Sequence, residues 1–203
     1  MPRPKQRTED LRRHILQTAV GLIAADGVAG FTTRRVVEEA STSVPAMYEL
    51  FGDKSGLVRE IFFEGFRLLR DQLDDLEPSV DPHADLVCLL QTFRRFYREN
   101  PVLARVMFSR PFPDFDPGPA EEEAGRSVRE HVVSHVRRAI EAGTLEGNQT
   151  DIAHVILALA QGMAAVEVAG WLGSSTASVE RRWALAIDAL LDGLRPPRRT
   201  NRS

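Results

Sequence analysis

The side chains with the clearest binding chemistry lie within residues 31–54. Arg34 carries a guanidinium, Tyr48 a phenol and Lys54 an ammonium, and all three can donate hydrogen bonds to phosphates or to the edges of bases. Between Arg34 and Tyr48 stand three hydroxyl side chains at 41–43, which compete for backbone hydrogen bonds and favour a turn. Donors placed on two short helical patterns around such a turn predict a helix-turn-helix that binds DNA.

The spacing of apolar residues predicts the two helices that must position these donors. A first helix is expected over 33–40, after good N-cap residues at 32 and 33. A second helix is expected to begin after Ser43 as its N-cap, with Pro45 in its first turn, where a missing N–H costs no helical hydrogen bond. The inward stripe of this helix is expected to be Met47, Leu50 and Phe51. The outward set, expected to enter the major groove, is Val44, Pro45, Ala46, Tyr48 and Glu49.

This run resembles the DNA-binding domain of the tetracycline-repressor (TetR/AcrR) family of bacterial transcription regulators. The resemblance rests on a Thr-Thr-Arg start at 32–34, on Pro45, Tyr48 and Phe51, and on the Asp-Lys pair at 53–54, and it covers residues 8–62. It implies a homodimer that binds a palindromic double-stranded DNA operator, represses transcription and is released by a small-molecule effector.

Carried over residue by residue, the resemblance gives each candidate a role. Thr33 and Lys54 would bind phosphates, and Arg34 would offer its guanidinium to a guanine edge. Val44 and Pro45 would make apolar contact with a thymine methyl group, and Tyr48 would contact the backbone or a base. The full set of candidate DNA-binding residues is Thr33, Arg34, Ser43, Val44, Pro45, Ala46, Tyr48 and Lys54.

The run also departs from the usual pattern of the family. Ser41 stands where the family usually has Gly, Thr42 where it has a small aliphatic residue, and Val44 where it often has a basic or polar one. Phosphates repel the carboxylate of Glu49, which therefore either accepts a hydrogen bond from a cytosine amino group or pairs with an arginine. These departures leave an alternative function open, that of a helical interaction protein that has lost sequence-specific DNA binding.

Helical patterns continue through the rest of the 203 residues, and no segment alternates convincingly as a strand does. We therefore expect an all-α protein of about nine helices, with an N-terminal three-helix helix-turn-helix DNA-binding domain and a C-terminal helical ligand-binding and dimerisation domain. The expected boundaries are 1–53 for the DNA-binding domain, 54–194 for the effector-binding and dimerisation domain, and 195–203 for a disordered tail. Outside the helix-turn-helix, we expect helices over 9–25, 54–76, 83–99, 101–110, 120–142, 151–172 and 178–194.

The last two of these helices carry more apolar surface than one chain can cover. The helix expected at 151–172 is apolar almost all round, and small residues such as Ala158 and Gly162 allow another helix to approach closely. We therefore expect these two helices to pair with their copies in a four-helix dimer interface, as the family resemblance also implies. A purely internal core is the alternative.

An effector pocket is expected among the helices of the second domain. Aromatic and methionine side chains suit an apolar small molecule, although each of them would serve equally as ordinary core. The candidate lining residues are Phe66, Leu90, Phe93, Tyr97, Met107, Phe108, Val136, Leu159 and Met163.

An enzyme is not expected. His131 and His135 are four residues apart, and Asp151 and His154 three, so each pair would share one helix face and could bind a metal. A di-iron bundle needs paired Glu-x-x-His motifs and two further carboxylates, which are missing, as are a Gly-rich phosphate loop and a nucleophile elbow. We therefore interpret the histidines as surface residues and expect no cofactor and no metal.

Charge and composition favour a cytoplasmic, nucleoid-associated protein. The net charge is −3, yet residues 1–54 carry eight Lys and Arg against seven Asp and Glu. The basic residues gather before residue 14, where an unstructured arm could contact phosphates or simply act as a solubilising terminus. Cys88 is the only cysteine, no signal-peptide pattern begins the chain, and no run reaches the roughly 18 consecutive apolar residues of a membrane span.

Overall fold

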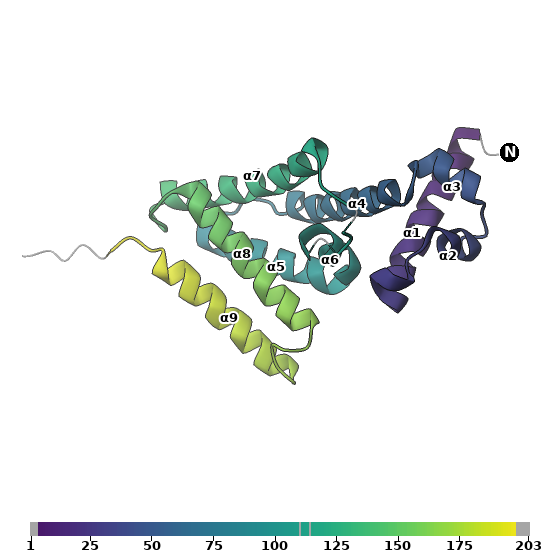
Figure 1. Cartoon of the computed structure of the whole chain (residues 1–203). Coiled ribbons are helices and arrows are strands. Elements are labelled where there is room, and N and C mark those ends of the chain that lie inside the picture. The colour runs from purple at the N-terminus through teal and green to yellow at the C-terminus, as the bar shows by residue number, and fades with distance from the viewer. Residues whose placement is uncertain (1–3, 110, 114, 198–203) are drawn as a thin grey trace, which may run out of the picture. The chain divides into compact units, whose positions relative to one another are not determined.

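Nine α-helices make up the part of the chain that the structure describes. The computed structural model describes residues 4–109, 111–113 and 115–197, and these residues contain no strand (Figure 1). The all-α class predicted from the sequence is therefore confirmed. The helices are α1 (Pro4–Gly30), α2 (Thr33–Glu39), α3 (Val44–Phe51), α4 (Lys54–Asp74), α5 (Pro82–Glu99), α6 (Pro101–Ser109), α7 (Pro119–Glu141), α8 (Gln149–Val168) and α9 (Thr176–Gly193).

The helices pack as two compact units. The first unit contains the residues up to Arg67 together with Val102–Glu122, and the second contains Leu68–Pro101 and the residues from Glu123 onward. Both α4 and α7 thus contribute residues to each unit. The domain boundaries expected at residues 53 and 194 stay a prediction.

Several helix ends differ from the prediction. α1 begins at Pro4 rather than at residue 9, because proline fits a first helical position and the long side chains after it are good helix formers. The unstructured arm considered for the basic N-terminus is therefore wrong for residues 4–8, while Arg3 lies outside the described residues. α1 also extends past residue 25 to Gly30, with a break at Gly27, whose φ of 69° suits glycine.

At the other end of the chain, α8 stops at Val168, four residues before the predicted end. Gly170, with φ of 77°, lies just beyond the helix in the left-handed conformation that commonly terminates helices. α9 ends at Gly193, and residues 195–197 that follow it are not helical. The rest of the predicted disordered tail, residues 198–203, lies outside the described residues.

The core of the first unit is formed by one apolar stripe from each of its N-terminal helices. α1 contributes Ile15, Ala19, Leu22 and Ile23, and α3 contributes Met47 and Phe51. The buried residues of these helices and of the start of α4 are Ile15, Ala19, Leu22, Ile23, Phe31, Val36, Val37, Ala40, Met47, Phe51, Leu57, Val58 and Ile61. This burial orients α2 and α3 within the unit.

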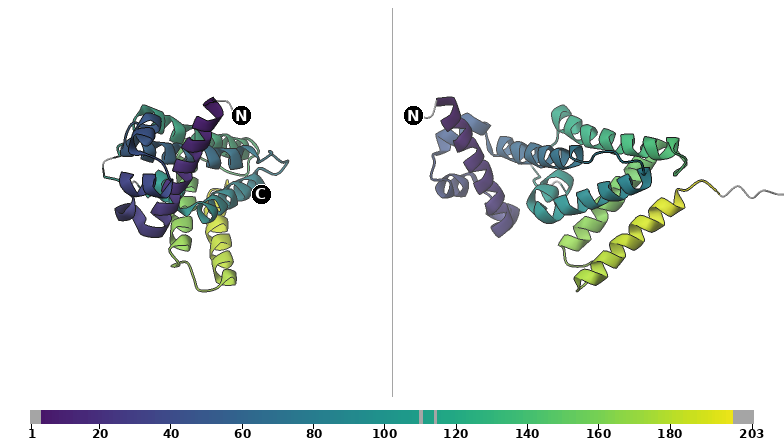
Figure 2. Two further views of the ribbon diagram at one scale, coloured as in Figure 1. Left: turned by 90° about the vertical axis from the view of Figure 1, so that its right-hand side faces the viewer. Right: turned by 180° about the vertical axis from the view of Figure 1, so that it is seen from behind.

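The core of the second unit is centred on α5. Its buried face is met by α8 and by α9, which run side by side in opposite directions (Figures 1 and 2). The apolar side chains buried here include Leu86, Leu89, Leu90, Phe93, Phe96, Ile152, Ile156, Ala160, Ala164, Trp183, Ile187 and Leu191. Along α8 and α9 these residues recur every three or four positions, so each helix buries a single face.

Candidate nucleic-acid interface

The two helices of the predicted helix-turn-helix begin at the caps that the sequence indicates. The hydroxyl of Thr32 accepts a hydrogen bond from the backbone N–H of Arg35 at 3.3 Å, and that of Ser43 accepts one from Ala46 at 3.3 Å. Pro45 lies in the first turn of α3, as predicted. Each cap pairs an N–H that the helix itself leaves without a partner, so the helices start at defined residues.

The turn between α2 and α3 is tight and places Ser41 in a strained conformation. The N–H of Ser41 donates to the carbonyl of Glu38 at 3.2 Å, and that of Thr42 donates to the carbonyl of Val37 at 2.9 Å, which is the pattern of a Schellman motif. Ser41 has φ of 50° and is the one non-glycine residue with positive φ in the described ranges. Left-handed backbone crowds a Cβ, which explains why a glycine suits this position better.

The exposed face of α3 is the one predicted to meet DNA. Met47 and Phe51 are buried, and one side of the eight-residue helix is thereby held inward. Tyr48 is 46% exposed and Val44 37% exposed. Leu50, predicted to lie in the inward stripe, is half-buried rather than buried. The outward set predicted for this helix is Val44, Pro45, Ala46, Tyr48 and Glu49, all exposed except the half-buried Ala46.

Glu49 lines an open cavity of about 360 Å³ with Leu11 and Ala46. It forms no ion pair with the residues that the structure describes. The pairing with an arginine that the sequence left as one alternative is therefore absent from this part of the chain, and the contact with cytosine stays a prediction.

The remaining candidates surround α3. Thr33 opens α2 and is half exposed, and Arg34 follows it with its side chain in solvent, where its Nε donates to Glu38 at 2.8 Å. Lys54 opens α4, and its Nζ lies 5.3 Å from the centre of the Phe31 ring. The structure thus places all of these residues in the first unit, while their contacts with DNA stay predictions.

Arg12 supports α3, a role that sequence reasoning missed. It donates to the carbonyl of Leu50 at 2.9 Å, pairs with Glu60 at 2.7 Å, and lies with its guanidinium 5.0 Å from the centre of the Phe51 ring. One side chain of α1 therefore contacts the end of α3 and the start of α4. Its place in a basic cluster suggested a phosphate contact, whereas its spacing of three residues from the buried Ile15 was the signal of an inward role.

Phe112, Phe115 and Glu121, from a segment expected as a loop and a helix start, lie in the core of the first unit. The Phe112 ring lies 5.4 Å from that of Phe31, and the Phe115 ring 5.7 Å from that of Phe62. Glu121 is buried and pairs with Arg59. Burial alone would raise the pKa of the Glu121 carboxyl, but hydrogen bonds from Arg59 and from backbone N–H groups outweigh it and hold that pKa below its usual value.

The nine candidate pocket residues divide between the two units. Phe66, Met107 and Phe108 lie in the first unit, where the Phe66 and Phe108 rings are 5.8 Å apart. The six in the second unit are Leu90, Phe93, Tyr97 and Val136, which are buried, and Leu159 and Met163, which are half exposed. Burial raises the pKa of the Tyr97 phenol. The pocket itself stays a prediction.

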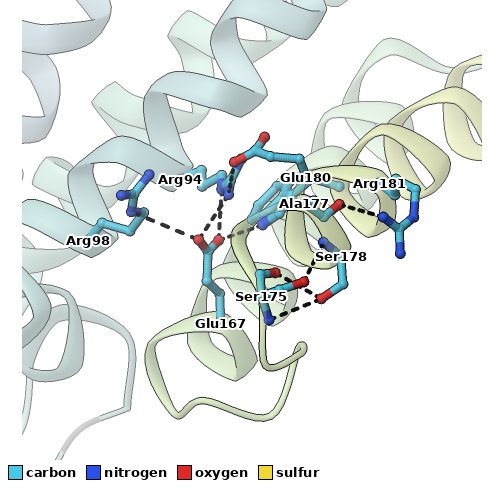
Figure 3. A network of polar contacts seen from close by, with 9 residues as sticks. Arg94, Arg98, Glu167, Ser175, Ala177, Ser178, Glu180 and Arg181 are labelled. Carbon is cyan, nitrogen blue, oxygen red and sulfur yellow. Dashed lines mark hydrogen bonds and ion pairs between the residues drawn. The ribbon is translucent and has the colours of Figure 1, made fainter.

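A buried arginine ties α5 to the last two helices (Figure 3). Arg94, 5% exposed, donates to both carboxylate oxygens of Glu167 at 2.7 and 2.9 Å and to both of Glu180 at 2.8 and 2.7 Å. Trp183 also donates to Glu167, at 2.6 Å. Burial alone would raise the pKa of Glu167, but these donors outweigh it and lower that pKa. The network sets the register of the three helices.

An apolar face of α8 remains uncovered on the side roughly opposite α5. Its exposed members recur at helical spacing and are mostly small: Val155, Ala158, Gly162, Ala165, Val166 and Ala169. Two large apolar side chains are also exposed: Trp171, at 86%, in the loop before α9, and Leu185 of α9, at 69%. The alternative of a purely internal core is therefore wrong for these side chains. By length and composition α8 could also cross a membrane, a test that core helices pass as well.

Of the histidines expected at the surface, His154 is exposed, whereas His131 and His135 are largely buried. His135 is 5% exposed, the side chain of His131 is 11% exposed, and their rings lie 4.8 Å apart. Burial, followed by the charges of His135 and Arg70, lowers the pKa of His131 to about 4. No group of three or more metal-ligating side chains occurs in the portion of the chain that is described.

Comparisons with known proteins agree with this arrangement. Residues 15–61 match the model described as bacterial regulatory proteins, tetR family, and residues 86–190 match that of the tetracyclin repressor-like C-terminal domain. A solved protein of unknown function from Rhodococcus is 27% identical, with a TM-score of 0.78 over 92% of this chain and 96% of that one. The TetR family transcriptional regulator PfmR from Thermus thermophilus is 19% identical, with a TM-score of 0.72 over 90% and 99%. No curated protein matches the chain.

The strained turn makes a stability prediction. Replacing Ser41 with Gly removes the crowded Cβ, and even after the extra entropy of glycine in the unfolded chain we expect a gain of about 0.5 to 1 kcal/mol in the free energy of unfolding. Urea denaturation followed by circular dichroism measures it. Ser43→Ala is the matched control, because loss of the α3 cap should cost about 1 kcal/mol. An unchanged or lower stability of Ser41→Gly would show that the turn holds no strain.

Proposed function

Because the chain belongs to the tetracycline-repressor family of bacterial transcription regulators, we propose that it binds a palindromic operator in double-stranded DNA as a homodimer and represses transcription until a small apolar effector releases it. It would act in the cytoplasm, associated with the nucleoid. It needs no catalytic group for this role, and its partners are the operator, the effector and a second copy of itself.

The observation that carries the proposal is the exposed face of α3. Met47 and Phe51 anchor the adjacent side of this helix in the core, and Val44 and Tyr48 remain exposed on an element that is held in place. A recognition helix of this kind enters the major groove with its N-terminal residues nearest the bases. Tyr48 and Val44 supply a hydroxyl and an apolar surface there, and the apolar surface suits a thymine methyl group.

Two further cations support the proposal. Arg34 carries a guanidinium that can bind the O6 and N7 atoms of guanine together, and its side chain lies in solvent. Lys54 opens α4 and would bind a phosphate, as Thr33 would at the start of α2, where helix N-termini favour anions. Such contacts on two sides of α3 would set its orientation on the duplex.

The uncovered face of α8 supports the homodimer. One DNA-binding domain of this size contacts only a few base pairs, whereas two such domains related by a twofold axis contact both halves of a palindrome. Small residues such as Ala158 and Gly162 allow two helices to pack closely, and Trp171 and Leu185 are large apolar side chains exposed in the loop before α9 and on α9. An exposed apolar surface of this kind marks an interaction site.

The DNA-binding proposal is tested by selecting bound duplexes from a random pool. We expect a palindromic site, and we expect Arg34→Ala or Tyr48→Ala to weaken binding to it by roughly 5- to 150-fold, as for the loss of one base contact. Arg126→Ala, which removes an exposed arginine of the second unit, should leave affinity unchanged. Failure to bind any duplex at low salt would favour the interaction protein instead.

The dimer is tested by placing a charge on its proposed surface. Leu185→Glu would bury an unpaired carboxylate between the copies, so we expect monomers at micromolar concentration by sedimentation and weaker binding to the palindrome. Val80→Glu is the matched control, because Val80 is fully exposed in the segment before α5. A monomeric wild-type protein, or a dimer that tolerates the Leu185 change, would contradict this interface.

The effector is tested by calorimetric titration with apolar compounds, first alone and then with the selected duplex present. A compound that binds the effector-binding domain should lower the protein's affinity for the duplex by roughly 5- to 150-fold, the usual range of coupling between two sites. Because the coupling is reciprocal, the duplex should weaken the compound by the same factor. Compounds that bind without changing affinity for DNA would contradict release by an effector.

A further inference from the structure

Arg34, the proposed guanine reader, is held by a carboxylate of its own helix. Glu38 lies one turn further along α2, and its Oε1 accepts a hydrogen bond from the Nε of Arg34 at 2.8 Å. Both side chains are largely in solvent, with exposed fractions of 86% for Arg34 and 60% for Glu38. The ion pair therefore lies on the surface of α2 that carries the proposed reader.

The geometry of this pair matches what a guanine reader needs. A guanidinium is a planar fork, with Nε on one side and the two terminal nitrogens at its end. Glu38 binds through the Nε side, so the terminal end points away from the carboxylate. Guanine presents O6 and N7 as two neighbouring acceptors, which a guanidinium binds with two parallel hydrogen bonds.

Folding gains little from an ion pair of this kind. Exposed pairs four residues apart on a helix are weak, because water screens the charges and two long side chains lose conformational freedom. Binding has more to gain, since an arginine already held in one orientation loses less conformational entropy when it meets a base. Pairing also reduces the repulsion that a lone carboxylate would meet from nearby phosphates.

We propose that Glu38 is a positioning residue that orients the guanidinium of Arg34 toward a guanine in the operator. This inference rests on the proposed DNA-binding function. The neighbouring basic residue is engaged elsewhere, since Arg35 pairs with Asp26 at 2.6 Å and donates to the carbonyl of Gly30 at 3.3 Å. Arg34 is thus the arginine of α2 whose orientation depends on a residue of the same helix face.

The test measures base preference, a readout that a purely structural role would not change. The guanine assigned to Arg34 is the position of the selected duplex at which Arg34→Ala loses its base preference. The affinity of the wild-type protein for this duplex is compared with its affinity for duplexes in which that guanine is replaced. We expect Glu38→Ala to reduce the preference for guanine by roughly 2- to 10-fold, the factor expected when one long side chain must be ordered on binding. Its melting temperature should match that of the wild type.

Three further variants separate positioning from charge. Glu38→Gln keeps an oxygen that can accept from Nε, so it should retain most of the preference for guanine. Glu39→Ala removes the next exposed carboxylate of α2 and should leave the preference unchanged. In the Arg34→Ala background, Glu38→Ala should have no further effect on preference, because Glu38 acts through Arg34.

Several outcomes would overturn the proposal. If Glu38→Ala kept the full preference for guanine, or changed affinity only as much as Glu39→Ala does for every duplex, Glu38 would contribute charge alone. If no position of the selected site lost its preference in Arg34→Ala, there would be no guanine for Glu38 to serve. A wild-type protein that bound no duplex would remove the proposed function together with this inference, a result distinct from the first two.

Discussion

The anchoring of α3 is the constraint on which the proposed interface depends. A helix of eight residues is too short to persist alone in water, because the cost of starting it exceeds what its few hydrogen bonds return. Burial of Met47 and Phe51 supplies the missing stabilisation. Since side chains follow a period of 3.6 residues, Val44 and Tyr48 lie beside this buried stripe, on the flank of the helix that stays exposed. The same packing therefore stabilises the helix and sets its orientation in the unit.

The rest of the first unit reinforces this anchoring from a distance along the chain. Arg12 reaches the end of α3 from α1, and Phe112 packs against Phe31 at the start of the helix-turn-helix. The first unit therefore contains more than the three N-terminal helices, since Val102–Glu122 also belongs to it. A change at Phe112 therefore acts on the packing around Phe31, next to the start of α2.

In the second unit the comparable constraint is ionic. Removing Arg94 and Glu167 from water is costly, and the cost is offset only when most of their hydrogen-bonding groups are matched. Around Arg94 they are, through four hydrogen bonds to Glu167 and Glu180 and one from Trp183. This matching works in only one register of α5, α8 and α9. That register leaves a band of small apolar residues on α8 facing outward, where a second copy can cover them.

The sequence by itself determined what depends on neighbouring residues. The caps at Thr32 and Ser43, the proline in the first turn of α3 and the inward positions Met47 and Phe51 follow from local hydrogen bonding and helical period. The resemblance to the family, which usually has Gly at this position, indicated that Ser41 was unusual before its φ was known. The all-α class followed from the same periodicity.

Tertiary structure alone decided the contacts between residues far apart in the chain. The pairing of Arg12 with Glu60, of Arg59 with Glu121 and of Arg94 with Glu167 joins residues whose separation no local pattern encodes. It also decided the burial of His131, which looked like a surface residue in the sequence. A polar side chain is free to lie outside or inside according to its partners, and these partners come together only when the chain has folded.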